Sequence, residues 1–232
     1  MALTAASIMT LVGRNLSDED AVRWTLPELC GWINEAVKAI ILAKPSACAS
    51  QIALSLQAGT LQAIGTGNLA LLRLVRNLTS AGPPRVGGRI ITPTSRETLD
   101  AQEPYWHDPS KVRYRKEARQ FVYDEENPLN FYVYPGNDGT GLVEALVSKL
   151  PTAIAASGDP ALLASYEQDV GLQELYQPPI LDYVLFRALS KDDTVANATG
   201  ATMHYQAFAT AIGLKIQVEG SNSPNSRARV QA

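Results

Sequence analysis

The chain has little cysteine and little histidine, and both shortages limit its chemistry. Its 232 residues include only Cys30, Cys48, His107 and His204 of these two types. Two cysteines are too few for a disulfide framework, and their separation does not match a metal site. No Gly-x-Ser-x-Gly turn accompanies the two distant histidines. The sequence therefore predicts no catalytic triad and no metal centre.

Long apolar runs and an excess of positive charge are also missing. No run of about 18 apolar residues occurs, which predicts that no helix crosses a membrane. The N-terminus has no basic region before its apolar residues, so we interpret it as a helix rather than a signal peptide and expect folding in the cytoplasm. The net charge is −3, with 46% hydrophobic and 19% charged residues. This composition is typical of a globular protein and argues against a general nucleic-acid binder.

Motifs for cofactors and acid–base catalysis are incomplete. Gly65-Thr-Gly-Asn68 begins like a dinucleotide-binding fingerprint but lacks its third glycine, and no phosphate loop occurs. The paired carboxylates Glu125-Glu126 and Asp192-Asp193 occur in turn-like sequence, where solvated acids are common. We therefore predict a protein that is not an enzyme and that has no catalytic, cofactor-binding or metal-binding residues.

The stretch from Trp24 to Pro45 has the clearest helical pattern. Apolar residues recur at the spacing of one helical face between Leu26 and Ile41, and Pro45 ends the pattern. Glu28, Asn34, Glu35 and Lys38 are expected on the opposite side. Trp32 lies at the edge of the apolar stripe, where a place in the core and a place in a subunit contact are both open.

Further helices are expected at both ends of the chain. Leu3 to Val12 suits a short amphipathic helix, and Ser17 is a candidate first residue of another helical turn. Near the C-terminus, Pro178-Pro179 opens a helix with an apolar stripe, and residues 195–213 form the next one. The stripe of that last helix is predicted to contain Ala201, Tyr205, Phe208, Ala209 and Ile212.

The middle of the chain is predicted to be mostly strand. Residues 51–57 alternate between apolar and polar, which predicts a strand. Residues 58–60 are read as a turn, and residues 61–64 are expected to form a strand that runs back beside the first. Aromatic and β-branched residues indicate a hairpin between Arg119–Asp124 and Asn130–Tyr134. Further expectations are a strand at 68–78, a helix at 94–101, a turn at 135–139 and a strand at 141–150.

Together these elements predict an α+β protein. N- and C-terminal helices, residues 1–46 and 153–217, form a bundle, and residues 47–152 form an inserted antiparallel β-sheet or sandwich. Residues 218–232 contain turn and linker residues with almost no apolar anchor, which predicts a flexible tail. We expect this tail to become ordered against a partner.

The densest basic segment runs from Lys111 to Arg119, with five positive charges and one negative charge. A solvated strand leading into the hairpin, a nucleic-acid contact and pairing with acidic surfaces of a neighbouring subunit are all open for this segment. Arg227 and Arg229 in the tail suit protein contacts better than DNA, because two charges give weak affinity for a phosphate backbone. The candidate partner or subunit contacts are Lys111, Arg113, Arg115, Arg119, Arg227 and Arg229.

Several aromatic and turn positions carry a resemblance to a known family. They are Arg23-Trp24, Pro27-Glu-Leu29, Trp32-Ile-Asn-Glu-Ala36, Gly88-Arg89, Arg96-Glu-Thr-Leu-Asp100, Pro104-Tyr-Trp-His107 and Phe131-Tyr-Val-Tyr-Pro135. In these positions the chain resembles the head-to-tail adaptor proteins of tailed bacteriophages, also called connector, gatekeeper or tail tubular proteins. The resemblance covers about residues 20–136.

The resemblance implies a structural virion protein in the neck between capsid and tail. It implies a ring, typically of twelve copies, that contacts the portal protein and a tail or nozzle protein. Genomic DNA would pass through this ring without sequence-specific binding, and no membrane is involved. Another neck or tail-tube subunit is an alternative, and a nucleic-acid-processing factor that uses Lys111–Arg119 is a further one.

Overall fold

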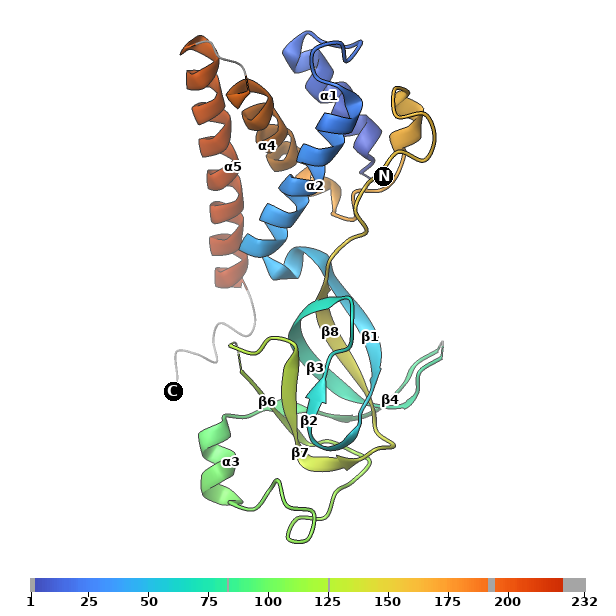
Figure 1. The fold of residues 1–232 in the computed structure, drawn as a ribbon. Coiled ribbons are helices and arrows are strands. Elements are labelled where there is room, and N and C mark those ends of the chain that lie inside the picture. Colours follow the sequence, from blue (N-terminus) through green and yellow to red (C-terminus); the bar gives the residue numbers. More distant parts are fainter. Residues whose placement is uncertain (1–2, 83, 125, 192–194, 223–232) are drawn as a thin grey trace. The chain divides into compact units, whose positions relative to one another are not determined.

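A computed structural model describes residues 3–82, 84–124, 126–191 and 195–222, of which 195, 196 and 214–222 are described by their backbone alone. Residue contacts divide the chain into two units. The helical unit contains residues 1–47 and 151–232, and the β unit contains residues 48–150. Helices and strands are both present, so the predicted α+β class is confirmed (Figure 1).

The helical unit is built around helix α4, which packs against α1, α2 and α5 (Figure 1). Two short 3-10 helices, η2 and η3, precede α4, and a third, η1, follows α2. The bounds of these elements are α1 Ala5–Leu16, α2 Leu26–Ala43, η1 Pro45–Cys48, η2 Leu163–Tyr166, η3 Glu174–Tyr176, α4 Gln177–Ser190 and α5 Val195–Asn222.

The turn between α1 and α2 is held by one carboxylate. Ser17 ends α1 in the left-handed conformation, with φ of 54°, so the prediction that Ser17 begins a helical turn was wrong. The Asp18 carboxylate accepts hydrogen bonds from the backbone N–H groups of Val22, Arg23 and Trp24 at 2.8–3.0 Å. These bonds satisfy backbone N–H donors in the turn. In a helix the same groups would donate to backbone carbonyls instead.

Helix α2 supplies much of the core of the helical unit. Its predicted stripe is buried from Leu29 to Ile41, and Trp32 is 8% exposed, which places its side chain in the core. Asn34 lies only partly exposed instead of facing solvent, because its side chain pairs with a separate segment. Its Oδ1 accepts from the Ile154 N–H at 2.8 Å, and its Nδ2 donates to the Ile154 carbonyl at 2.9 Å.

Polar and aromatic contacts fix α4 against its neighbours. Lys191 and Arg187 pair with Glu28 and Glu35 of α2 at 2.6 and 3.3 Å. Within the predicted stripe of α5, Ala201, Phe208 and Ile212 are buried, as expected. Tyr205 and Ala209 are exposed instead; the Tyr205 ring packs beside Phe186 of α4, with centroids 5.0 Å apart.

Helix α5 continues to Asn222, past its predicted end at Gly213. The first proline after Val195 is Pro224, so nothing in the intervening sequence stops a helix as Pro45 stops α2. Helix therefore includes the first residues of the predicted tail. The rest of that tail, with Arg227 and Arg229, lies outside the described residues.

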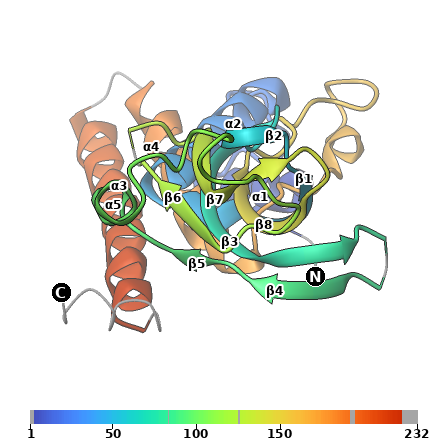
Figure 2. The same ribbon diagram turned by 90° about the horizontal axis from the view of Figure 1, so that it is seen from below.

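The β unit consists of two four-stranded sheets with one hydrophobic core between them. The strand orders are β1-β8-β3-β4 and β2-β7-β6-β5, and every pair is antiparallel except the short β5–β6 pair (Figure 2). The strands are β1 Ala49–Ser55, β2 Ala58–Ala63, β3 Asn68–Ser80, β4 Val86–Ile90, β5 Thr92–Pro93, β6 Gln120–Tyr123, β7 Asn130–Asp138 and β8 Leu142–Lys149.

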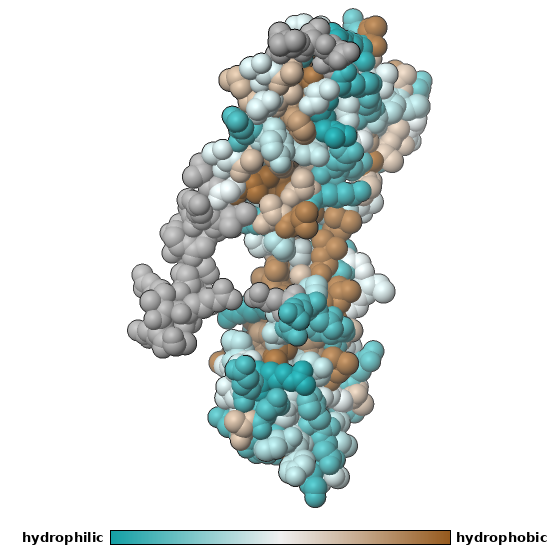
Figure 3. All heavy atoms as spheres, turned by 60° about the vertical axis from the view of Figure 1, so that its left-hand side comes forward, coloured by the Kyte–Doolittle hydropathy of each residue, from teal (hydrophilic) through white to brown (hydrophobic). Residues whose placement is uncertain are grey.

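A second, smaller apolar cluster lies under helix α3, Arg96–Gln102. Leu99, Trp106 and Val122 are buried there, and Tyr132 and Tyr134 pack against them. The predicted helix at 94–101 is confirmed as α3, and Ser95 caps it, since its hydroxyl accepts the Thr98 N–H at 3.1 Å. The outer surface of the β unit is different: hydrophilic residues predominate at its lower end in Figure 3.

Two expectations for the strands were wrong. Strands β1 and β2 do not form a hairpin, because β1 pairs with β8 and β2 pairs with β7. Strand β4, which the sequence did not predict, pairs with β3. Residues 135–139 are not a turn, because β7 continues through Pro135 to Asp138 and the chain turns at Gly139–Gly141. The predicted hairpin of β6 and β7 is confirmed.

Candidate functional site

The basic segment Lys111–Arg119 is irregular rather than a strand, but its backbone is firmly held by β7. The Arg115 N–H donates to the Gly136 carbonyl at 2.8 Å, and the Arg119 N–H donates to the Tyr134 carbonyl at 2.8 Å. Arg115 also forms a single parallel bridge with Asn137 of β7. The expected strand is replaced by a loop whose path is set by these contacts.

Asn137 joins the basic segment to β7 and to the turn that follows it. This residue is 0% exposed. Its Nδ2 donates to the carbonyls of Arg115 and Lys116 at 3.1 and 2.8 Å. Its Oδ1 accepts from the N–H groups of Gly139 and Gly141 at 2.8 and 3.1 Å. One buried amide therefore satisfies four backbone groups, which explains why β7 continues where a turn was expected.

The basic segment and β7 enclose a groove of about 230 Å³. The four predicted contact residues of the segment all contribute to it, whereas Lys116, Glu117 and Arg73 do not. Its lining residues are Glu103, Lys111, Val112, Arg113, Arg115, Arg119, Tyr134 and Pro135. The four cationic side chains are exposed, and none of them forms an ion pair with a residue that the structure describes. We call this feature the basic groove.

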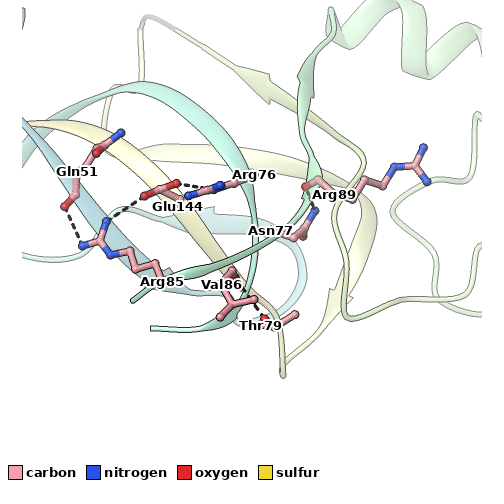
Figure 4. Close-up of polar contacts among 8 residues, drawn as sticks. All are labelled: Gln51, Arg76, Asn77, Thr79, Arg85, Val86, Arg89 and Glu144. Carbon is pink, nitrogen blue, oxygen red and sulfur yellow. Dashed lines mark hydrogen bonds and ion pairs between the residues drawn. The ribbon is translucent and has the colours of Figure 1, made fainter. Parts of the chain in front are cut away.

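A second polar arrangement lies on the other sheet, at the β3–β4 arm, which comprises residues 76–90 (Figure 4). The Glu144 carboxylate of β8 is 5% exposed and accepts from Arg76 Nε at 2.8 Å and Arg85 Nη1 at 3.1 Å. Arg85 also donates through Nη2 to the Gln51 carbonyl of β1 at 3.2 Å. These contacts join β3, β8 and β1 of one sheet through Arg85, which lies directly before β4.

Asn77 fixes the base of the same arm. It is 3% exposed, and its Nδ2 donates to the carbonyls of Arg89 and Ala118 at 2.9 and 2.7 Å. Its Oδ1 accepts the Ala118 N–H at 2.9 Å. Gly88 lies so close that a Cβ there would be 3.3 Å from the Asn77 carbonyl oxygen. Because of these contacts β4 stays paired, although all five of its residues are exposed.

The ion pairs of Glu144 with Arg76 and Arg85 make a pH-dependent contribution to stability. Burial raises the pKa of Glu144, but hydrogen bonds and charges from Arg85 and Arg76 outweigh burial and lower the pKa overall. A lowered pKa in the folded state stabilises the fold above the unfolded pKa of about 4.3, and this contribution disappears as pH falls through the folded value. We expect Glu144→Gln to cost about 1–2 kcal/mol of unfolding free energy at pH 7, since both arginines are about one-third exposed.

Urea unfolding from pH 7 to pH 3 measures this effect. The wild-type protein should lose more stability on acidification than the variant, so that the difference between them shrinks. Glu117→Gln is the control, because Glu117 is exposed and forms no ion pair with a described residue. A difference between wild type and Glu144→Gln that stays constant with pH would contradict the prediction.

The two histidines have structural partners. His107 Nδ1 lies 2.7 Å from Thr60 Oγ1, and its ring stacks on Trp106. Burial, with the charge of Arg96, lowers the pKa of His107. His204 Nδ1 lies 2.9 Å from the Asp182 carboxylate. Within the described ranges, no three metal-binding side chains gather at one place and no helix is long and apolar enough to cross a membrane.

Sequence reasoning found the four cations of the basic groove through their density along the chain. It missed Glu103 and Tyr134 as part of the same groove, because no local pattern brings them to the basic segment. Arg76, Arg85 and Glu144 were also missed, since the residues that pair are 59 or more positions apart. A charged residue inside the strongly apolar sequence of β8 was the one available signal for Glu144.

Comparison with known proteins gives the family. No curated protein matches the chain. The sequence profile of the family described as SU10 adaptor protein matches residues 3–230, which include both the helical unit and the β unit. This match confirms the resemblance that the aromatic and turn positions indicated over about residues 20–136. The chain therefore belongs to the SU10 adaptor protein family, a family of phage head-to-tail adaptors.

Proposed function

We propose that this protein forms a ring, with twelve copies as the expected number, that joins the portal to the tail and extends the DNA channel in the neck of the virion. The observation that carries the proposal is the family match over residues 3–230. An adaptor acts through surfaces rather than reactive groups, and both units are included in that match. The protein is then a structural component with at least two kinds of neighbour, other copies of itself and different virion proteins.

The charge distribution supports different partners for the two units. The helical unit has 13 acidic and 9 basic residues, a net charge of −4, and the β unit has 10 acidic and 11 basic residues, a net charge of +1. Each unit also has its own buried core, so each can present a defined surface to a neighbour. Complementary potentials favour correct partners and speed their encounter.

Negative-stain images of the purified protein, alone and mixed with portal, test the proposal. We expect rings that stack coaxially on the portal. Mass measurement by light scattering gives the number of copies in each ring. Rings that bind tail-tube protein but not portal would instead assign the chain to another part of the neck or tail. Protein that remains monomeric with every virion component would contradict an adaptor ring.

A further inference from the structure

We propose that the basic groove binds a carboxylate-rich segment of a tail protein. This inference rests on the proposed function, because it names the surface that meets one partner of the adaptor. The contact residues are Lys111, Arg113, Arg115 and Arg119, with Tyr134 at the wall of the groove. The ligand is an acidic peptide segment whose aspartate or glutamate side chains enter the groove.

The first argument is the charge of the groove. Four cations share a volume of about 230 Å³ with a single acid, Glu103. The described residues provide no ion-pair partner for any of the four. Like charges held close together are unfavourable, and an anion between them removes that repulsion. Three of the four are arginines, whose planar guanidinium groups bind carboxylates through paired hydrogen bonds.

The second argument is that the groove is formed before any ligand arrives. The Arg115 and Arg119 N–H groups donate to the carbonyls of Gly136 and Tyr134, and Asn137 Nδ2 donates to the carbonyls of Arg115 and Lys116. The hydroxyl of Tyr114 donates to the His107 carbonyl at 2.7 Å, which fixes the same loop from its other side. Binding of a ligand therefore requires little further ordering of this loop backbone. Less of the interaction energy is lost to ordering, so more of it contributes to affinity.

The third argument favours a carboxylate segment over nucleic acid. A volume of about 230 Å³ suits one or two side chains and is smaller than the roughly 300–1,000 Å³ typical of small-molecule sites. Duplex DNA requires a stripe of cations that follows many phosphates. Here the cations converge on one hollow and an acid lies among them. The net charge of the chain, −3, also disfavours general binding to DNA.

The fourth argument favours a tail protein over a second copy. The chain enters the β unit at β1 and leaves it at β8, and the segment after α3 lies at the end of the β unit remote from these connections (Figure 1). A separate protein that approaches this end reaches the basic groove directly. Contact between the β units of two copies would offer 10 acids for 11 bases, so it supplies no acid excess to fill the groove.

Fluorescence anisotropy with a labelled oligoglutamate peptide tests the groove on the full-length protein at low salt. We expect Arg113→Gln combined with Arg115→Gln to weaken peptide binding by about tenfold or more, because two charge-assisted contacts are lost. Arg73→Gln combined with Lys116→Gln is the matched control. It removes the same charge from exposed residues of the β unit outside the groove and should change binding by less than about twofold.

A second pair of variants tests the groove by a gain of affinity. Glu103→Gln removes the acid inside the groove, and we expect it to tighten peptide binding several-fold. Glu117→Gln changes the net charge equally but lies outside the groove, and should have little effect. Because all these side chains are exposed, each variant is expected to fold, and circular dichroism melting confirms it.

Several outcomes would overturn the proposal. Equal losses from the groove pair and its control would show unspecific charge attraction. Tighter binding to duplex DNA than to the peptide, abolished by Arg113→Ala, Arg115→Ala and Arg119→Ala together, would assign the groove to nucleic acid. Ring dissociation caused by the groove variants would assign it to a second copy. A further outcome is that the groove variants bind the peptide as tightly as the wild-type protein does, while wild-type rings still stack on the portal. That result would reject the proposed role of the basic groove and leave the adaptor role intact.

Discussion

Replacing Asn137 with alanine is expected to lower the free energy of unfolding by about 4 kcal/mol. The side chain is fully buried and makes four hydrogen bonds to backbone groups. Each such bond contributes about 1 kcal/mol net, and the Arg115 carbonyl keeps a second donor, the Asp138 N–H at 3.2 Å. Urea unfolding monitored by tryptophan fluorescence measures the change.

Asn127→Ala provides the control for this prediction. Asn127 is exposed, and with the described residues its side chain makes one hydrogen bond, which it accepts from Asn130 Nδ2 at 2.9 Å. We expect a change within about 0.5 kcal/mol for that variant. The Asn137→Ala protein should also bind acidic peptide more weakly at temperatures where it remains folded, since the backbone of the basic groove is no longer held. A loss below about 1 kcal/mol would show that water replaces the amide without strain.

Replacing Trp106 with alanine is expected to cost about 3–5 kcal/mol, the range for deletion of a large buried aromatic side chain. Trp106 is 0% exposed and forms the centre of the small cluster beneath α3. Its ring packs edge-on against Tyr132 at 5.8 Å and its Nε1 donates to the Asp100 carboxylate at 2.8 Å. Loss of the ring removes the support of α3 as well as the cluster.

Two further substitutions separate the contributions of packing and of hydrogen bonding. Trp106→Phe keeps an aromatic ring in the cluster but loses the bond to Asp100, so we expect a smaller loss of about 1–2 kcal/mol. Tyr105→Ala truncates the adjacent aromatic residue, which is 64% exposed, and should change stability by less than about 0.5 kcal/mol. Thermal and urea unfolding of the three variants should give this order. Equal losses for Trp106→Ala and Tyr105→Ala would contradict it.

Local patterns predicted the elements whose stability depends on one buried face. The stripe from Leu29 to Ile41 identified α2, alternating apolar residues identified β1, and aromatic and β-branched residues identified the β6–β7 hairpin. The partner of each strand was harder to predict. Residues 58–60 resemble a turn, but β2 pairs with β7, a segment about 70 residues away, and the sequence of β2 alone does not contain that information.

Side-chain bonds to distant backbone explain the remaining errors. Pro135-Gly-Asn-Asp-Gly139 has the composition of a turn, yet Asn137 bonds to residues 115 and 116 and keeps β7 extended. Asn34 was expected in solvent because it is polar, although it pairs with Ile154. The cations of the basic groove were recognised as candidates from charge density, but their convergence depends on where β7 holds the loop. Such contacts join segments that no local window contains.

The position of Arg85 has a consequence for how the protein behaves at high concentration. Strand β1 forms one edge of its sheet, and an open edge invites pairing with a strand of another molecule. Arg85 donates a hydrogen bond to the Gln51 carbonyl of that strand and places a positive charge beside it. The residue that ties the β3–β4 arm to Glu144 therefore also guards the sheet against uncontrolled aggregation.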